Sequence, residues 1–186
     1  MLSSPRLAFR RFVPADLDLL HQSIYRHPKV AETLSPTGEL TIRNTEYILY
    51  RRLKHWYEHG FGAWALLYRD NQALVGHCGL HYLDDYPEVE LTYTIHPDYW
   101  GQGLATEAAQ VVLHWGFETL QLSQIVAVSG PDNHASQRVL QKLGMQYEKQ
   151  IRYNGTEVNY YALTRSQYRQ MQATGTIDSI DRSNEK

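Results

Sequence analysis

The chain has 186 residues, of which 42% are hydrophobic, and its formal net charge is −2. This length suits one domain with a sizeable core, and the absence of a basic run argues against a nucleic-acid or anionic-membrane partner. No apolar stretch approaches the ~20 residues of a membrane span, and residues 1–11 lack the apolar centre of a secretory signal. We therefore expect a soluble cytoplasmic protein, and the single cysteine, Cys78, excludes an internal disulfide.

The first half of the chain is predicted to form strands and two helices. Apolar residues alternate with polar ones in the strands, and Leu17, Leu20 and Ile24 recur at helical spacing. Residues 35–41 have the composition of a loop. The predicted elements are a strand at 7–12, a helix opened by Pro14-Ala15-Asp16 with Asp16 as its cap, a helix at 42–58 ended by Gly60, and strands at 62–68, 74–83 and 88–95.

The second half alternates helices with strands and ends in a polar tail. Residues 174–186 bury little and are expected to be disordered, outside a single domain at 1–173. The order of elements predicts an α/β fold of mixed α+β type, with helices on the faces of one sheet. The predicted elements are a helix at 106–120, a strand at 125–128, a helix at 135–143, and two strands within 145–164 around Asn154-Gly155, a dipeptide typical of tight hairpins.

The most informative stretch is a strand that runs into Gly101 and Gly103 just before a predicted helix. Glycine allows the backbone to turn tightly and to approach a ligand closely. The first N–H groups of a helix have no internal partner, and they lie at the positive end of its dipole. The turn therefore predicts a site for a phosphate or a pyrophosphate.

Three phosphate-binding loops compete for this pattern. A Walker loop requires Lys followed by Ser or Thr after the last glycine, and Leu104 and Ala105 stand there instead. A dinucleotide loop requires glycine or alanine where Thr106 stands, within an early strand-helix-strand unit. The surroundings favour the third, an acyl-CoA loop. For the glycine pair alone, a turn that holds only water remains the alternative.

Three segments carry a resemblance to a known family. They are Arg6-Leu-Ala-Phe-Arg-Arg-Phe12 followed by Asp16, Tyr99-Trp-Gly-Gln-Gly-Leu-Ala-Thr-Glu-Ala108, and Asn133-His-Ala-Ser-Gln-Arg-Val-Leu-Gln-Lys-Leu-Gly-Met145. In this order and spacing the chain resembles the GNAT acetyltransferase superfamily, and within it the RimJ/RimL-like branch, over about residues 5–170. The sequence departs from the family at Leu140, where many members carry a catalytic tyrosine seven residues after the asparagine.

The resemblance implies a strongly twisted mixed sheet, flanked by helices, whose central parallel strands at about 89–95 and 124–128 splay apart. The pantetheine arm of acetyl-CoA would enter this gap and pair with the backbone near Thr94 and Ile95. The pyrophosphate would meet the turn, and Asn133 would contact the thiol region unless it makes only a local bond. The implied cofactor-binding residues are Thr94, Ile95, Trp100, Gly101, Gln102, Gly103, Leu104, Ala105, Thr106, Asn133 and Ser136.

Two side chains are candidates for the chemistry that the resemblance implies. An attacking amine must be neutral, so a general base assists it, and Glu90 on the polar face of a strand is our hypothesis for that base. The alternative is a solvated strand residue. Since Leu140 replaces the usual tyrosine, Ser136 is the hypothetical partner of the leaving thiolate, with Tyr147 in reserve; Ser136 packed or capping within its helix is the alternative. Backbone N–H groups near Ile95 would stabilise the oxyanion.

The histidines and the acidic loop complete the set of candidates. His55 with His59, and His77 with His81, share element faces but have no further ligand at metal spacing, so we expect no metal site. Segments 34–41 and 82–88 are expected to select the acceptor, because loops carry specificity on a rigid scaffold. The acids of the second segment would suit a cationic amine; they are Asp84, Asp85 and Glu88.

The resemblance therefore implies an N-acetyltransferase that moves an acetyl group from acetyl-CoA to a primary amine by direct attack in a ternary complex. The acceptor is expected to be a protein N-terminal amine, such as that of a ribosomal protein, or a small molecule. The alternative is an inactive acyl-CoA-binding module with a regulatory or structural role, which Leu140 favours. A homodimer is expected from the branch alone.

Overall fold

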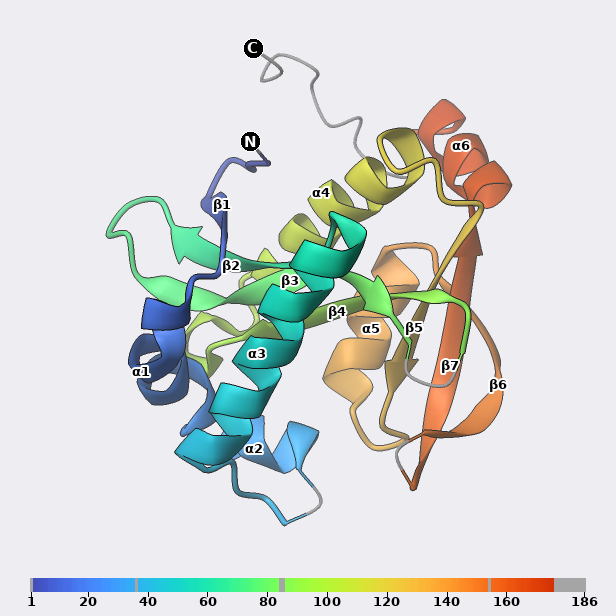
Figure 1. Ribbon diagram of the computed structural model, residues 1–186. Helices are drawn as coiled ribbons and strands as arrows, with labels where there is room; N and C mark the ends of the chain where they lie inside the picture. Colours follow the sequence, from blue (N-terminus) through green and yellow to red (C-terminus); the bar gives the residue numbers. More distant parts are fainter. Residues whose placement is uncertain (1, 36, 84–85, 154, 176–186) are drawn as a thin grey trace.

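A seven-stranded mixed sheet, with strand order β1-β2-β3-β4-β5-β7-β6, forms the centre of the molecule. The computed structural model describes residues 2–35, 37–83, 86–153 and 155–175. The sheet carries helices on both faces (Figure 1), which confirms the predicted fold class. Strands β1 to β4 form an antiparallel meander, β4 and β5 are parallel, and β5, β7 and β6 are antiparallel again.

The predicted elements occur in the predicted order, with bounds that differ by a few residues, and two further helices, Pro28–Leu34 and Arg165–Ala173, were not predicted. The strands are β1 (Leu7–Arg11), β2 (Ala63–Tyr68), β3 (Leu74–Tyr82), β4 (Val89–Ile95), β5 (Gln124–Ser129), β6 (Gln146–Tyr153) and β7 (Thr156–Thr164). The α-helices are α1 (Leu17–Leu20), α2 (Pro28–Leu34), α3 (Ile42–His59), α4 (Leu104–Glu118), α5 (His134–Lys142) and α6 (Arg165–Ala173). Short 3-10 turns lie at Pro14–Asp16 and Pro97–Tyr99, and a π-helical turn lies at His21–Tyr25.

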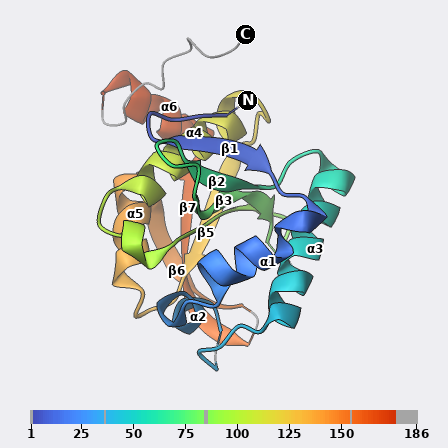
Figure 2. The same ribbon diagram turned by 90° about the vertical axis from the view of Figure 1, so that its left-hand side faces the viewer.

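The helices form two layers, with α1, α2 and α3 on one face of the sheet and α4 and α5 on the other (Figure 2). Strand β4 serves both layers, because successive side chains on a strand point to opposite faces. Its residues Val89, Leu91 and Ile95 join the core under α4. Glu90 lies between Val89 and Leu91 on the strand, so its side chain points to the opposite face, toward α1–α3. No helix among the described residues is long and apolar enough to span a membrane.

Helix α3 shows how local sequence sets the bounds of an element. Thr41 caps it, because its hydroxyl accepts from the Asn44 N–H at 3.3 Å and the Asn44 side chain accepts from the Thr41 N–H at 2.8 Å. Gly60 ends it at φ 73°, a left-handed conformation that suits glycine. The helix thereby places Arg52, His55 and Trp56 over the sheet.

The central strands splay, as the resemblance implied. Strand β4 pairs with β3 along its whole length, whereas its only registered partner on β5 is Val126 opposite Glu90. Beyond that rung β4 and β5 diverge. The amide of His96 donates to the Val75 carbonyl at 2.8 Å, so alternation along β4 turns the backbone groups of Tyr93 and Ile95 away from β3 and toward the gap.

Two local predictions were wrong. Asp16 does not cap a helix: Pro14 begins a 3-10 turn, and the Asp16 carboxylate accepts from the Val13 N–H at 2.8 Å and binds Arg10 at 2.7 Å. Helix α4 begins two residues before the predicted 106, since Gly103 is already its N-cap.

Helix α6 was not predicted, and two predictions fall largely on residues that the structure does not describe. The predicted hairpin does join β6 and β7, but its Asn154 lies outside the described residues. Of the tail expected to be disordered, 176–186 lie outside them as well.

Candidate functional site

The glycine turn has the geometry of an anion site. Gly101 and Gly103 have φ values of 76° and 79°, which other residues rarely adopt, so both glycines are required by the backbone. The first amide of α4 with a partner inside the helix is that of Glu107, which donates to the Gly103 carbonyl at 3.0 Å. Within the described part of the chain, no amide of residues 101–106 donates a hydrogen bond. These donors point out of the N-terminus of a helix of 15 residues.

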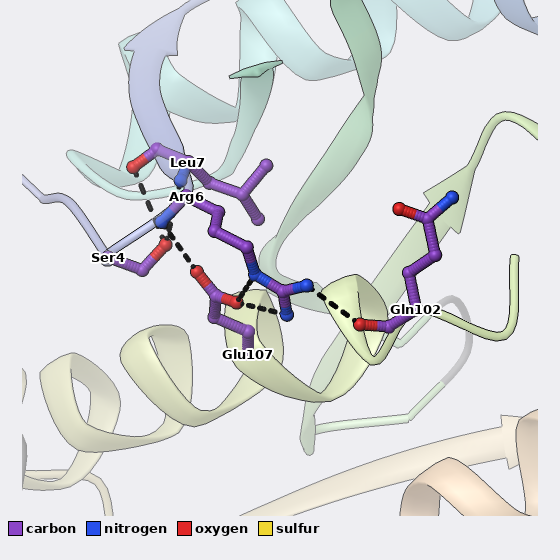
Figure 3. A network of polar contacts seen from close by, with 5 residues as sticks. All are labelled: Ser4, Arg6, Leu7, Gln102 and Glu107. Carbon is purple, nitrogen blue, oxygen red and sulfur yellow. Dashed lines mark hydrogen bonds and ion pairs between the residues drawn. The ribbon is translucent and has the colours of Figure 1, made fainter. Parts of the chain in front are cut away.

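A polar clamp holds this turn against β1 (Figure 3). Arg6 donates to the Gln102 carbonyl at 2.9 Å, and its Nε donates to the Glu107 carboxylate at 2.7 Å. The Arg6 backbone amide donates to the other Glu107 oxygen at 2.9 Å. Burial raises the pKa of Glu107, but hydrogen bonds from Ser4 and Arg6 and the Arg6 charge outweigh burial, so this pKa lies below its ordinary value.

Trp100 closes the other side of the turn. Its indole N–H donates to the Ile95 carbonyl at 2.6 Å, although the side chain stays half-exposed. The Gln102 side chain donates to the Asp98 carbonyl at 3.0 Å. Both residues were predicted to contact the cofactor; the structure shows that they shape the turn.

Of the two β4 residues predicted to pair with the cofactor, Ile95 faces the gap between β4 and β5 and Thr94 does not. Thr94 is paired with His77 on β3, and alternation directs its amide and carbonyl toward that strand. The groups that face the gap belong to Tyr93 and Ile95. A ligand that pairs with β4 would therefore meet these two residues rather than Thr94.

Asn133 and Ser136 meet at the start of α5, on the α4 side of the gap. The Asn133 side-chain oxygen accepts from the Ser136 amide at 3.0 Å, so Asn133 is the helix cap. Among the described residues its amide nitrogen has no partner. The Ser136 hydroxyl lies 2.8 Å from the Tyr93 hydroxyl, which also donates to the Ser136 carbonyl at 3.2 Å.

Tyr93 was missed as a functional candidate because its position among apolar strand residues predicted a core side chain. Its ring does pack against the core. Burial raises the pKa of Tyr93, and the hydrogen bond with Ser136 lowers it by less, so the phenol stays protonated at neutral pH. A hydroxyl on an otherwise apolar strand face was the one available signal.

Glu90 is buried, with 7% of its surface exposed, which contradicts the alternative of a solvated strand residue. Its Oε2 lies 3.1 Å from Nε2 of His81, its partner across the β3–β4 ladder. Two residues earlier, the carboxylate of Glu88 has a buried oxygen with no partner among the described residues. Burial raises the pKa of Tyr160 to about 12, and the nearby Glu88 charge adds to this effect.

The remaining predicted candidates have structural environments. Leu140 is fully buried, so its position belongs to the core. Tyr147, on the edge strand β6, contacts Tyr161 edge-to-face with ring centres 5.8 Å apart, and no described contact joins it to Ser136 or Glu90. Within the residues that the structure describes, no group of three or more metal-binding side chains is found. Asp84 and Asp85 lie outside those residues.

His55 is held in one neutral tautomer by backbone groups. Its Nε2 accepts from the Tyr82 amide at 3.1 Å, so the proton lies on Nδ1, which donates to the Phe61 carbonyl at 2.7 Å. Burial lowers the pKa of His55, in agreement with this arrangement. His55 therefore joins α3 to β3 and is not placed as a metal ligand.

Comparisons with known proteins agree with this geometry. The family model described as "Acetyltransferase (GNAT) domain" matches residues 6–146. The uncharacterized N-acetyltransferase YoaA of Bacillus subtilis is 38% identical over 109 residues, which are 55% of this chain and 62% of that protein. The chain spans 49% to 62% of the first curated relatives that it matches.

Two solved structures share the fold. The GNAT-family acetyltransferase from Bacillus anthracis has a TM-score of 0.74 and 26% identity, covering 89% of this chain and 98% of that one. RimL, a ribosomal L7/L12 alpha-N-protein acetyltransferase solved with coenzyme A, has a TM-score of 0.71 and 17% identity, covering 87% of this chain and 95% of that one. At 17% identity, the similarity to RimL shows a shared fold and no more.

Proposed function

The chain belongs to the GNAT acetyltransferase family, and from that premise we propose that it transfers the acetyl group of acetyl-CoA to a primary amine in a ternary complex. The observation that carries the proposal is the single rung between β4 and β5. It leaves a gap with the open N-terminus of α4 and the Tyr93–Ser136 pair on one side and the buried Glu90 on the other. Thioester and amine would meet in this gap from opposite faces.

The residues on the α4 side fit the parts of acetyl-CoA, which supplies an activated thioester. The six free amides at 101–106 match the negative charge of a pyrophosphate. The amide and carbonyl of Tyr93 and the amide of Ile95 face the gap and can pair with the amides of a pantetheine arm, whereas the Ile95 carbonyl already accepts from Trp100. The free amide nitrogen of Asn133 stands beside them, at the start of α5.

Glu90 is the proposed base. An amine attacks only when it is neutral, and a lysine-type amine has a reference pKa of ~10.4, so a nearby carboxylate that accepts its proton speeds the reaction. His81 contacts only one oxygen of Glu90, at 3.1 Å. With its proton on Nε2, His81 donates to that oxygen and orients the carboxylate, leaving the other oxygen for the amine.

Ser136 is proposed to stabilise the departing sulfur, with Tyr93 positioning it. A thiol has a reference pKa of ~8.5 and a phenol of ~10, so full proton transfer from the buried Tyr93 to a thiolate is unfavourable. A hydrogen bond needs no such transfer. Either hydroxyl can donate across their 2.8 Å contact. In the arrangement where Tyr93 donates its single proton to Ser136 Oγ, the serine hydroxyl proton is free to point at the sulfur.

The acceptor is proposed to be a protein N-terminal amine or a small-molecule amine. A curated relative, spermidine N(1)-acetyltransferase of Escherichia coli, is 32% identical over only a third of each chain. This partial similarity supports an amine acceptor but does not distinguish a protein N-terminal amine from a small-molecule amine.

The test measures thermal unfolding with acetyl-CoA, NAD or ATP, and then thiol release with a panel of amines. A ligand at ~100 times its Kd stabilises a protein by roughly 2.7 kcal/mol. We expect acetyl-CoA alone to raise the Tm, and at least one amine to release CoA. No shift with acetyl-CoA would overturn the proposal, and a shift without turnover for any amine would favour the inactive binding module.

A further inference from the structure

Three polar side chains from three different elements meet on the α1–α3 face of the sheet. Tyr25 comes from the π-helical turn at His21–Tyr25, Arg52 from α3 and His77 from β3. Arg52 Nη2 donates to the Tyr25 hydroxyl at 2.7 Å and to His77 Nε2 at 2.8 Å, and the Tyr25 hydroxyl lies 3.0 Å from the same nitrogen. Tyr25 and His77 are 1% and 2% exposed.

This cluster has more donors than acceptors. Arg52 only donates, so His77 Nε2 must be unprotonated and the imidazole proton lies on Nδ1. His77 Nδ1 and Arg52 Nη1 are both buried, and neither has a partner among the described residues. A buried polar group left without a partner destabilises the fold, and a charged group does so more strongly. The cluster therefore lacks an acceptor.

Arg52 also lacks a counter-ion. None of the ion pairs within the described residues includes it. Its guanidinium lies 5.2 Å from the ring centre of Phe12 and 5.8 Å from that of Tyr25, which leaves it between aromatic rings. Burial lowers the pKa of His77 well below its ordinary value and the Arg52 charge lowers it further, so Arg52 is the one cation of the cluster.

The cluster lies on the same sheet face as Glu90. His77 is paired with Thr94, and His81 is paired with Glu90 four residue pairs further along the same ladder. Paired residues point to one face, so a half-buried strip of β4 that includes Thr92 runs between a cation and a carboxylate. Four residues of strand span about 13 Å, and both long side chains shorten that distance.

We propose that Arg52, together with Tyr25 and His77, binds a carboxylate of the acceptor, so that the acceptor is a small molecule carrying both an amine and a carboxylate. The planar guanidinium matches a carboxylate in a bidentate fashion and would gain the acceptor that the cluster lacks. The amine would lie toward Glu90, where Glu88 adds a second negative charge. This inference rests on the proposed function, and it disfavours a polyamine.

The first test is turnover with matched acceptors. Amino acids with a terminal amine are compared with amino alcohols of the same length, because both amines have similar pKa values. We expect the carboxylate to raise kcat/KM at least tenfold, about 1.4 kcal/mol. R52M should remove that preference through the KM of the carboxylate acceptor, and R52K should keep part of it. The exposed Arg43, also on α3, provides the matched control R43M, which should leave the preference unchanged.

The second test does not depend on turnover. Binding of simple aliphatic carboxylates to the protein saturated with CoA is measured by calorimetry for the wild type, R52M and R43M. We expect binding that R52M alone abolishes. Absence of carboxylate binding to the wild type would overturn the inference even if amines are acetylated. Carboxylate binding without turnover would support the inference while the proposed function fails.

Stability separates binding from a purely structural role. Arg52 carries a partly buried charge, and removing a charge from water costs free energy. In R52M the Tyr25 hydroxyl can still donate to His77 Nε2, 3.0 Å away. We therefore expect R52M to unfold at the same temperature as the wild type or higher. A large loss of stability in R52M, with the preference for carboxylate acceptors intact in that variant, would show that Arg52 serves the fold alone.

Discussion

The two faces of β4 are built in different ways. On the α4 side, consecutive residues form the turn. Arg6 binds Glu107 and the Gln102 carbonyl there, and Trp100 donates to the Ile95 carbonyl. On the α1–α3 side, side chains from distant parts of the chain meet, and Arg52 and His77 keep buried donors without partners among the described residues. This difference fits our two proposals, a preformed site for the cofactor on one face and a carboxylate-binding cluster on the other.

The largest expected effect is on Glu90. E90Q keeps the shape of the side chain but cannot accept a proton, so kcat/KM should fall by roughly 10²–10⁴ while the KM of acetyl-CoA stays unchanged. The measurement is the pH–rate profile of thiol release, in which the variant should lose the limb due to Glu90. Near-full activity at every pH would remove Glu90 as the base.

The next effect tests the opposite face. G103A places a Cβ on a residue with φ 79°, a strain of ~1–2 kcal/mol, and should shift the turn enough to raise the acetyl-CoA Kd about tenfold. G155A is the matched control, since Gly155 also has φ 79° and nothing lies within 4 Å of its added Cβ. Calorimetry should show weaker acetyl-CoA binding in G103A only. Equal affinities in the two variants would count against the turn as the pyrophosphate site.

A smaller effect is expected at the Tyr93–Ser136 pair. S136A should lower kcat by about tenfold, about 1.4 kcal/mol, because the departing sulfur loses one hydrogen bond. Y93F should lower kcat by less, since it removes only the group that positions the serine hydroxyl. Single-turnover rates would measure both. Comparable rates in S136A and the wild type would exclude Ser136 from the reaction.

The smallest expected effect is on the pH dependence of thermal stability. The pKa values of Glu107 and Asp16 lie below their ordinary values in the folded state, so each stabilises the fold above the unfolded pKa and loses that effect as the pH falls through the folded pKa. E107Q should therefore lower the Tm at pH 7. This difference should shrink as the pH falls below the ordinary carboxyl pKa of ~4.3 and vanish once the pH is below the lowered pKa of folded Glu107. A Tm difference that persists unchanged in acid would contradict the clamp.

The sequence predicted local patterns better than contacts between distant segments, and this difference does not follow the two faces of β4. Glu90 was predicted on the α1–α3 face, and Tyr93 was missed on the α4 face. The turn, Gly101 and Gly103 could be predicted because a helix N-terminus after two glycines is a local pattern. Tyr25, Arg52 and His77 could not, since their meeting depends on how α3 and the π-helical turn cross the sheet. The three residues are far apart in the sequence, so no local pattern indicates that their side chains meet.

Some misses had a readable local signal. Helix α6 opens with a capping box in which the Thr164 hydroxyl accepts from the Gln167 amide at 3.3 Å, and its Tyr168 stacks on Phe117 at 4.8 Å. A threonine followed three residues later by glutamine could have marked this helix. Asp16 was assigned to the wrong cap position because the proline two residues before it already starts the turn.

The divergence of β4 from β5 affects the risk of aggregation of the ligand-free protein. A strand with unpaired backbone groups is ordinarily an edge, and edges invite aggregation by pairing with other chains. Here an edge lies in the middle of a sheet. Helices α4 and α5 lie on one face of the sheet there (Figure 2). The Trp100 indole N–H donates to the Ile95 carbonyl at the open end of the gap. Trp100, which shapes the turn, thus also blocks one backbone group of this internal edge from pairing with another chain.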